Sequence, residues 1–400
     1  MTYDVQKIRE DFPALNSGLA FFDGPGGSQV PSQVGNAISN AITKPISNRN
    51  LTTQSERNAE EIVIDFRQAV GDLINTDPNG VVYGRSWTQL TYDFSRTLAK
   101  TWKLGDEIIV STLDHDSNIR PWVQAAESVG AVIRWAEFDI QTGELPISAI
   151  SDLLSAKTRL VAVTGAGNTL GTRPDIKEIA AEVHRTNAVL YVDGVHLTPH
   201  TSVDTQEMGA DFYGFSFYKL LGPHCAAIAA KPELLETLDN DKLLPSTSAV
   251  PERFEFGTLP YELMAGCTAA IDYIANLVES DQTNRRKRII ESMSGLEKYE
   301  DELFKFMETE ITALPGVRTY GHAAKRTPTI YFNLKGLEGV EVYKYLSKLH
   351  INAPAGNFYA LEVSRALGLG DTGAVRVGLA PYSTHDDVTR LINGLWKLVK

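Results

Sequence analysis

Two neighbouring stretches, YVDGVHLTPH (residues 191–200) and DFYGFSFYKLLGPH (residues 211–224), decide how this chain is interpreted. In the first, Asp193 ends an apolar run expected to be a strand buried on both faces. A carboxylate there needs a cationic partner, because an unpaired buried charge is costly. In the second, Lys219 follows an apolar, aromatic strand and precedes a Gly-Pro turn. A lysine desolvated in this way has a lowered pKa and becomes a usable amine nucleophile.

Similar apolar runs recur before and between these stretches, from about Val81 to Ala230. They are VVYG, EIIVS, AVIRWAEF, RLVAVTG, AVLYVDG, DFYGFS and CAAIAA. Short apolar runs that alternate with helical patterns are typical of a parallel α/β sheet. Several end in small or polar residues, among them Thr164 to Asn168 and Asp193. Ligands of open α/β sheets bind beyond such carboxyl ends, so these residues are expected to converge on a site.

The chain of 400 residues is longer than one hydrophobic core usually serves, so two domains are expected. We predict a large domain over residues 12–280 and a smaller α+β domain over 281–400. The smaller one begins with a long, charged amphipathic helix and continues with the short strands RTPTIYFNL and AVRVGLA. A first helix within residues 1–11 is expected to pack on it. The sequence contains no internal repeat and no low-complexity segment.

Composition excludes several classes of protein. The net charge of −12, from 38 basic and 50 acidic residues, argues against a nucleic-acid or anionic-membrane binder, which needs a basic surface. The N-terminus has no apolar signal-peptide core, and no run approaches the ~18 apolar residues of a membrane span. The only cysteines, Cys225 and Cys267, lie in apolar contexts and are too few for a disulfide framework. A cytoplasmic location is therefore expected.

Order and spacing make Asp193 and Lys219 more informative together than apart. Either residue alone has ordinary structural explanations. Asp193 followed 26 positions later by Lys219, with Ser216 and Tyr218 beside the lysine, is the arrangement that a pyridoxal 5′-phosphate (PLP) site needs. The lysine would hold PLP as an imine, a Schiff base. The carboxylate would keep the pyridinium nitrogen protonated, so that the ring can accept electrons.

At this point a family resemblance becomes specific, and it covers nearly the whole chain. The segments resemble class V aminotransferases of PLP fold type I, particularly their cysteine desulfurase-like branch. The matching segments are IREDFPAL, FFDGPGG, DHDSNIRPW, GNTLGT, VDGVH, SFYKLLGPH, RFEFGTLPYE and AVRVGLAPYST. The resemblance implies an α/β fold whose large domain holds a mostly parallel seven-stranded sheet, joined to a smaller α+β C-terminal domain.

The same resemblance assigns roles around the cofactor ring. It makes His115 the group that stacks on the pyridine ring and relays protons, with Lys219 as the other catalytic residue. Asn168 resembles the amide that contacts the ring hydroxyl, and His196 matches a position near that hydroxyl. Two ordinary alternatives stay open, because His115 could be a surface-loop histidine and Asn168 could stabilise a turn.

The phosphate is expected at the start of the helix in VVYGRSWTQLTYDFSRTLAK, since free N–H groups at a helix N-terminus favour anions. Thr88 and Gln89 stand at about that position, and Ser86 is an alternative within the same turn. Ser216 and Tyr218 resemble further phosphate ligands, and Tyr218 stands where many desulfurases have histidine.

Two further segments are assigned by resemblance alone. RFEFGTLPYE is similar to a loop that crosses a dimer interface, so Thr258 would contact the phosphate of the neighbouring subunit in a homodimer. Arg376 matches the family arginine that binds the substrate carboxylate in a bidentate manner, which implies an amino-acid substrate. An ordinary turn at 257–260 and a salt-bridged surface arginine are the alternatives. The FFDGPGGSQVP loop resembles a segment lining the substrate side.

One feature of the family is missing from this sequence, and its absence leaves the type of reaction undecided. Cysteine desulfurases carry a mobile cysteine before the carboxylate-binding arginine, but HINAPAGNFYALEVSRALGLGDTGAVR contains none. The favoured interpretation is a PLP-dependent C–S (β-)lyase without an enzyme persulfide. A transaminase and a PLP-fold binding or assembly protein with little turnover are the alternatives. No cluster with metal-ligand spacing and no G-x-G-x-x-G after a strand occurs, so neither a metal nor a nicotinamide is expected.

Overall fold

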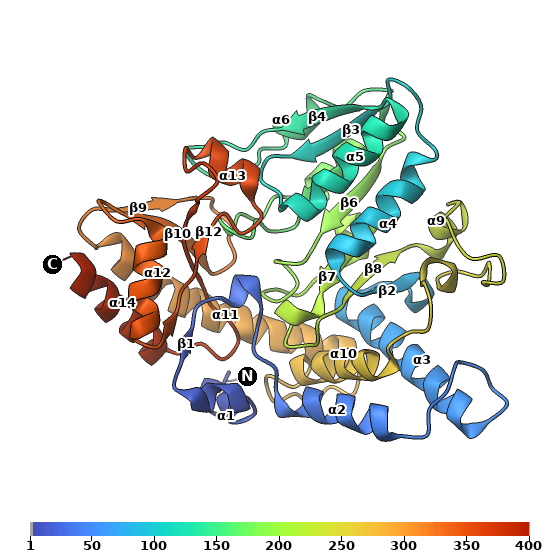
Figure 1. The fold of residues 1–400 in the computed structure, drawn as a ribbon, viewed down its shortest axis with the longest axis horizontal. Coiled ribbons are helices and arrows are strands. Elements are labelled where there is room, and N and C mark those ends of the chain that lie inside the picture. The colour runs from blue at the N-terminus through green and yellow to red at the C-terminus, as the bar shows by residue number, and fades with distance from the viewer. Residues whose placement is uncertain (1–2, 400) are drawn as a thin grey trace.

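The chain folds around a seven-stranded sheet (Figure 1), in a computed structural model that describes residues 3–399. Strand β8 is antiparallel to both of its neighbours, and the other adjacent pairs are parallel. In spatial order the strands are β2 (Val81–Gly84), β8 (Ala226–Ala230), β7 (Phe212–Ser216), β6 (Val189–Asp193), β5 (Thr158–Thr164), β3 (Glu107–Ser111) and β4 (Val132–Ala136). These are the seven apolar runs of the sequence, so the predicted mostly parallel sheet is confirmed.

Helices cover both faces of this sheet, which explains why its strands lack polar alternation. Successive residues of β5 alternate between two buried clusters. Val161 and Val163 join the helices on one side, and Leu160 and Ala162 join those on the other. The first side carries α3 (Gln54–Ile74), α7 (Ile176–Val183) and α10 (Tyr261–Ile274), and the second carries α4 (Trp87–Ala99) and α5 (Arg120–Val129).

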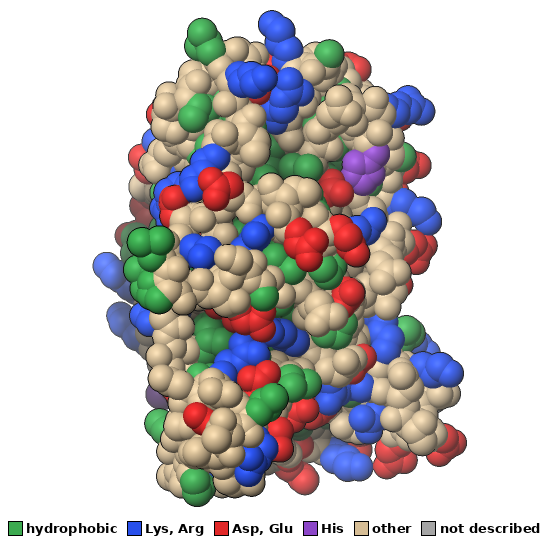
Figure 2. All heavy atoms as spheres, turned by 90° about the vertical axis from the view of Figure 1, so that its right-hand side faces the viewer, with side chains coloured by type: hydrophobic (Ala, Val, Ile, Leu, Met, Phe, Trp, Pro, Cys, Tyr) green, Lys and Arg blue, Asp and Glu red, His purple; other side chains and the backbone are tan. Residues whose placement is uncertain are grey.

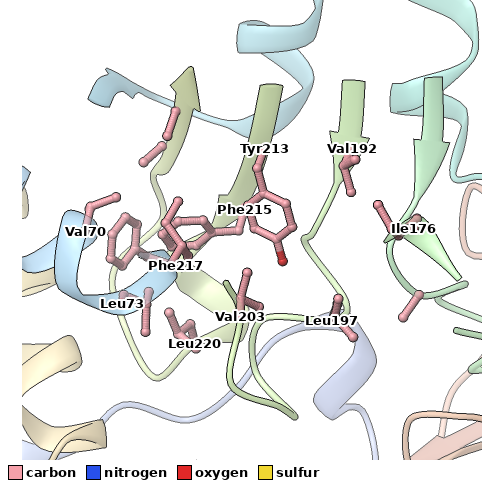
Figure 3. Close-up of a cluster of buried hydrophobic side chains, with 14 of the residues drawn as sticks. Val70, Leu73, Ile176, Val192, Leu197, Val203, Tyr213, Phe215, Phe217 and Leu220 are labelled. Atoms are coloured by element: carbon pink, nitrogen blue, oxygen red, sulfur yellow. The ribbon is translucent and has the colours of Figure 1, made fainter. Parts of the chain in front are cut away.

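Figure 3 shows the first cluster, where α3 packs on the strands. Val70 and Leu73 of the helix face Phe215 and Phe217, whose rings lie 5.0 Å apart. Phe215 belongs to β7 and Phe217 begins the 3-10 turn that ends at Lys219, so the packed core fixes the position of the turn that carries the lysine. The remaining helices around this sheet are α2 (Ser32–Thr43), α6 (Ser148–Ser151), α8 (Thr205–Met208) and α9 (Pro232–Glu236).

A second, four-stranded antiparallel sheet lies at the left of Figure 1, in the C-terminal part of the chain. Its spatial order is β12 (Ala355–Gly356), β13 (Ala374–Gly378), β10 (Thr329–Leu334) and β9 (Val317–Tyr320). The helices of this part are α11 (Arg285–Thr312), α12 (Gly339–Lys348), α13 (Leu361–Ala366) and α14 (His385–Val399). The long helix and both short strands expected there are present, and the domain division at 280/281 stays a prediction.

The N-terminal segment joins the two parts of the molecule. Helix α1 (Val5–Glu10) contacts the C-terminal part, where Arg9 pairs with Asp387 at 2.9 Å. On the other side, Tyr273 of α10 donates a hydrogen bond to the Asp11 carboxylate at 3.0 Å. Strand β1 (Ala20–Phe21) then pairs in parallel with β11 (Ile351–Asn352). Residues 1 and 2 of the predicted helical segment lie outside the described residues.

The surface mixes charges of both signs. On the face shown in Figure 2, basic and acidic side chains are interleaved with apolar groups. Within residues 3–399, no helix is both long and apolar enough to cross a membrane. The expected cytoplasmic location stays a prediction.

Candidate active site

A cavity lies at the carboxyl ends of β5, β6 and β7, the edge at which ligands of open α/β sheets bind. Two further segments complete it, one after β2 and one after β3. Its lining residues are Ser86, Trp87, Thr88, His115, Ser117, Thr164, Ala166, Asn168, Asp193, Val195, His196, Ser216, Tyr218 and Lys219. Eight of the site residues singled out in the sequence, together with the alternative Ser86, are therefore brought together.

Lys219 ends the short 3-10 turn that follows β7, and its side chain is buried. The turn is clamped by the early glycine-rich loop, since Ser28 donates its N–H to the carbonyl of Tyr218 at 2.9 Å. The amine of Lys219 has no hydrogen-bond or ion-pair partner among residues 3–399. Burial, reinforced by the charge of Arg376 and opposed by that of Asp193, lowers the pKa of Lys219 to about 7. The amine is thus available as a nucleophile near neutral pH.

Asp193 is the last residue of β6, and both of its carboxylate oxygens have donors. The N–H of Val195 reaches Oδ1 at 2.9 Å, and the indole N–H of Trp87 reaches Oδ2 at 2.7 Å. Burial raises the pKa of Asp193 to about 6, and these donors and Lys219 oppose that rise. The carboxylate also lines the cavity, so it faces whatever binds there. No sequence pattern singled out Trp87.

His115 lies across the cavity in a loop after β3. Its Nδ1 accepts a hydrogen bond from the backbone N–H of Ser117 at 3.1 Å, which leaves the proton of the neutral ring on Nε2. Burial and the charges of Lys219 and Arg376 lower the pKa of His115 to about 3. A neutral, flat imidazole results, which suits stacking on an aromatic ligand.

Asp114 fixes the position of the His115 loop. Its carboxylate accepts hydrogen bonds from Ser111 and Asn118, both at 2.6 Å, and from the N–H of Thr164 at 3.1 Å. These contacts tie the end of β3 to the end of β5. Burial raises the pKa of Asp114 to about 8, against the effect of the donors.

Asn168 and His196 each present a buried polar atom without a protein partner. Asn168 donates through Nδ2 to the carbonyl of Phe358 at 2.9 Å, while its Oδ1 has no partner. Nε2 of His196 lies 3.0 Å from the hydroxyl of Thr327, while its Nδ1 has none. Buried polar groups are rarely left unpaired in proteins. These atoms indicate a polar ligand in the cavity.

The start of helix α4 supplies donors at one end of the cavity. Ser86 caps the helix by accepting the N–H of Gln89 at 3.1 Å. The N–H groups of Trp87 and Thr88 have no acceptor in the described part of the chain and lie where an anion is favoured. The side chain of Gln89 bonds to Asp93 at 3.3 Å and does not line the cavity. Ser86 and Thr88 do line it.

Arg376 lies in β13, buried close to the cavity rim, and is not a solvated surface group. It donates through Nη1 to the carbonyl of Asn168 at 3.1 Å, and its Nε has no partner. The ring of Phe358 covers the guanidinium, with its centroid 3.7 Å from Cζ. Burial, opposed by the charge of Asp23, lowers the pKa of Arg376 to about 10, so the group stays cationic at neutral pH.

The loop that carries Phe358 forms a cover that the sequence did not reveal. Phe358 and Tyr359 have φ angles of 53° and 60°, a left-handed conformation that bulky residues rarely adopt. Two hydrogen bonds hold this strained backbone in place. Asn168 donates to the carbonyl of Phe358, and the N–H of Asp116 donates to the carbonyl of Tyr359 at 2.7 Å. The ring of Tyr359 stacks on His115 with centroids 5.5 Å apart.

Comparison with known proteins agrees with this geometry. The model of one protein family, described as aminotransferase class-V, matches residues 20–391. The chain belongs to that family. Its members are PLP-dependent enzymes, so the family resemblance and the enzyme class inferred from the sequence are confirmed.

Relatives of this class V chain span its whole length. It is 34% identical to the uncharacterized protein MT3887 of Mycobacterium tuberculosis, covering 100% of both chains. It is 31% identical to the aminotransferase-like protein FGM3 of Gibberella zeae, covering 98% of each. A cysteine desulfurase of Escherichia coli O7:K1 is 28% identical, covering 100% of this chain and 99% of the relative.

Solved structures share the fold. The cysteine desulfurase CsdA of Escherichia coli superposes with a TM-score of 0.88 at 23% identity, covering 100% of both chains. A C-DES mutant with glycine covalently linked to its PLP cofactor gives a TM-score of 0.79 at 18% identity, covering 97% of this chain and 98% of the other. The predicted fold type I architecture is thereby confirmed.

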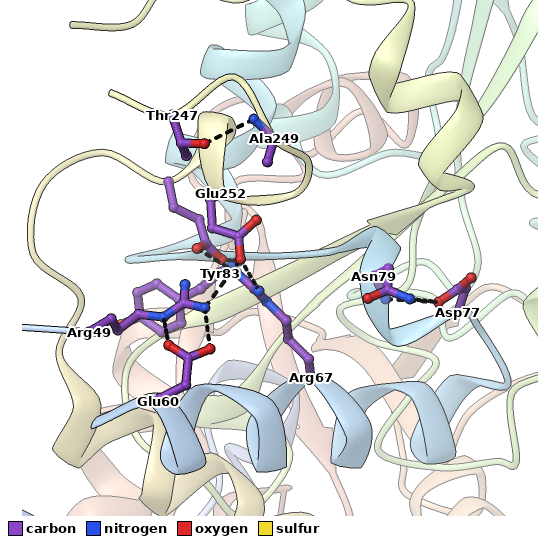
Figure 4. Close-up of polar contacts among 10 residues, drawn as sticks. Arg49, Glu60, Arg67, Asp77, Asn79, Tyr83, Thr247, Ala249 and Glu252 are labelled. Carbon is purple, nitrogen blue, oxygen red and sulfur yellow. Dashed lines mark hydrogen bonds and ion pairs between the residues drawn. The ribbon is translucent and has the colours of Figure 1, made fainter. Parts of the chain in front are cut away.

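In this class V chain, Thr258 lies outside the cavity. It lines a separate hollow together with Gln89. A network of ion pairs fixes the loop before it to helix α3 (Figure 4), with Arg67 bound to Glu252 at 2.6 Å and to Glu255 at 2.8 Å. Arg49 adds a second contact to Glu252 at 3.2 Å. The expected contact of Thr258 with a neighbouring subunit stays a prediction.

The two cysteines also lie away from the cavity. Cys225 and Cys267 are buried, with their sulfur atoms 3.1 Å apart. Burial raises the pKa of the Cys267 thiol well above its usual range, which makes it a poor nucleophile. Between residues 3 and 399, no group of three or more His, Cys, Asp or Glu side chains is arranged to hold a metal ion.

Proposed function

We propose that this chain is a PLP-dependent enzyme that acts on an amino acid through a Schiff base at Lys219, as a C–S (β-)lyase without a persulfide cysteine. One observation carries the proposal. The partnerless amine of Lys219 and the doubly hydrogen-bonded carboxylate of Asp193 line the same buried cavity. This pair supplies the two functions that PLP chemistry requires of a protein, an amine for the cofactor aldehyde and an anion for its ring nitrogen.

The residues around the cavity fit PLP in polarity. Asn168 and His196 offer buried atoms without partners to a ring hydroxyl, and His115 offers a flat neutral ring for stacking. The free N–H groups at the start of α4 and the Ser216 hydroxyl suit a phosphate. When bound, PLP supplies an electron sink for the carbanion formed at the substrate α-carbon.

Lys219 would act twice in the reaction. Its lowered pKa leaves the amine largely neutral slightly above pH 7, so it can attach to the cofactor. Once a substrate amine has displaced it, the same neutral amine can take the proton from the α-carbon. Neutral His115 would orient the ring and pass protons within the closed site.

Arg376 would bind the α-carboxylate of the substrate. Its Nη1 is held by the carbonyl of Asn168, whereas Nε is buried without a partner and adjoins Nη2. This edge of the guanidinium can therefore donate a hydrogen bond to each oxygen of a carboxylate, side-on. The stacked ring of Phe358 keeps the guanidinium plane fixed.

The lyase and transaminase reactions share every step up to the carbanion at the substrate α-carbon, and they differ in the fate of that carbanion. Neither Cys225 nor Cys267 lines the cavity, and both are buried, which supports a reaction that needs no enzyme thiol. The transaminase is kept as a second candidate because the chain is 31% identical to an aminotransferase-like relative. A binding or assembly role with little turnover is the third outcome of the test.

A homodimer in which Thr258 contacts the phosphate of the neighbouring subunit is part of the proposal. The ion pairs of Arg67 hold the loop before Thr258 in place, and the nearby Phe256 and Leu51 side chains are exposed. Exposed large apolar side chains beside an ordered loop are expected at a contact between subunits.

The deciding experiment is to incubate the PLP-loaded protein with cysteine, cysteine sulfinate and alanine, recording spectra and assaying sulfide, sulfite and keto acid. Sulfide with pyruvate formed from cysteine, and an unchanged visible cofactor band, support the lyase. Pyridoxamine phosphate formed with a stoichiometric amount of keto acid makes the chain a transaminase. A stable band without product leaves a binding role, and a protein with no visible band contradicts the proposal.

A further inference from the structure

Trp87 makes a direct polar contact with the carboxylate that the proposed function places at the cofactor ring. Its indole N–H donates to Oδ2 of Asp193 at 2.7 Å, and both side chains are buried. Trp87 is the first residue of helix α4, whereas Asp193 ends β6. The contact therefore joins the helix start expected at the phosphate to the strand end expected at the ring nitrogen.

The neighbouring strand is built to admit this indole. A Cβ atom on Gly214 of β7 would lie only 1.9 Å from Cζ3 of Trp87, so any side chain there would displace the ring. The indole also stacks on Tyr191, with centroids 5.3 Å apart and planes inclined by 29°. Trp87 is thus held in one orientation, with its N–H directed at the carboxylate.

The hydrogen bond acts on a carboxylate that burial would otherwise neutralise. Burial raises the pKa of Asp193 to about 6, while the N–H of Val195, the charge of Lys219 and the indole of Trp87 each lower it. The other ionisable groups that face Asp193 are Asp114 and the phenols of Tyr191, Tyr213 and Tyr218. The indole N–H is the only side-chain hydrogen-bond donor to the Asp193 carboxylate within residues 3–399.

We infer that Trp87 is a positioning residue for Asp193, which keeps this carboxylate ionised and aimed at the ring nitrogen of bound PLP. The inference rests on the proposed function. Without the indole donor, the carboxylate accepts the proton of the ring nitrogen more readily, and the ring loses its positive charge. The pKa of the imine formed with Lys219 would then be higher, because the ring beside it would no longer carry a positive charge.

The test is the pH titration of the visible band of the PLP-bound protein, in Trp87→Phe against the unchanged chain. Phenylalanine keeps an aromatic ring but removes the N–H. Because a hydrogen bond to a charged group is worth more than a neutral one, we expect the midpoint to rise by about one pH unit, a tenfold change. The PLP dissociation constant is expected to rise roughly tenfold.

Trp102→Phe is the matched control. Trp102 is buried in the same apolar cluster, and its indole has no hydrogen-bond partner among residues 3–399. It should lower stability by a similar amount, since the same atoms are removed from the same core, and leave the midpoint unchanged. Gly214→Ala should instead reproduce the shift with Trp87 intact, because it displaces the indole.

The outcomes separate this inference from the function on which it rests. A visible band in the unchanged chain, with the same midpoint in Trp87→Phe and in Gly214→Ala, overturns the role of Trp87 alone. Equal shifts in Trp87→Phe and Trp102→Phe also overturn it, because they show a loss of packing only. If the unchanged chain binds PLP without a visible band, the Lys219 assignment fails, and the role of Trp87 fails with it.

Discussion

The candidate site has two halves, the cavity itself and the residues that cover it, and they differ in how they are built. The inner half consists of strand ends of the seven-stranded sheet, where Asp193 and Lys219 are fixed by packing on both faces. The outer half consists of Arg376 and the loop with Phe358 and Tyr359, which is strained and held by a few hydrogen bonds. A rigid inner half suits a permanently bound cofactor. A loop-built outer half suits selection among substrates, since loops change without disturbing a core.

The largest effect is expected from Lys219→Ala. The proposed imine cannot form, so the visible band should disappear, and activity should fall roughly 10³-fold or more, as for other removed catalytic groups. Absorbance spectroscopy and turnover measure both effects, and circular dichroism checks that the fold is kept. Lys177→Ala, which alters an exposed lysine paired with Glu207, is the control. An unchanged band in Lys219→Ala would show that another group holds the cofactor.

Arg376→Lys tests whether the two halves act separately. Lysine keeps the charge but loses the planar fork, so kcat/KM for an amino acid should fall about 100-fold while the cofactor band is unchanged. Steady-state kinetics and the spectrum give the two readouts. Arg326→Lys alters an arginine paired with Glu308 and stacked on Phe304, away from the cavity, and should leave kcat/KM intact. Loss of the band in Arg376→Lys would mean that the halves are one unit.

The pH dependence of cofactor loading tests the inner half. Burial lowers the pKa of Lys219 to about 7, so the reactive neutral amine falls tenfold for each pH unit below that value. The rate at which the cofactor-free protein regains its visible band should therefore rise up to about pH 7 and level off above it. Stopped-flow absorbance measures this rate. A rate that keeps rising toward pH 10 would show an amine that is not desolvated.

What the sequence could reveal follows the same division. Asp193 and Lys219 were predictable because an apolar run with a charged residue at its end has few explanations in a buried sheet. Arg376 needed the family resemblance, since its own strand carries no such signal. No sequence pattern singled out Trp87, and only the folded chain brings its N–H to Asp193.

The outer loop escaped prediction for a different reason. Phe358 and Tyr359 resemble ordinary loop aromatics, and their left-handed φ angles depend on hydrogen bonds from Asn168 and Asp116, which are far away in sequence. Gln89 shows that the sequence does not determine which residues at the start of α4 face the cavity. It stands one residue after Thr88, and its side chain turns to Asp93 and away from the cavity.

The smallest effect is expected from Phe358→Ala, which removes the ring over Arg376. A cation–π contact of this kind is worth ~1–2 kcal/mol when desolvated, so KM should rise about tenfold with little change in kcat. The cofactor band should stay, because Phe358 does not line the inner cavity. Phe306→Ala, which removes a ring stacked on His385 elsewhere, is the control for lost stability. An effect on kcat alone would mean that the ring acts on the reacting atoms, and the division between a cofactor half and a substrate half would have to be redrawn.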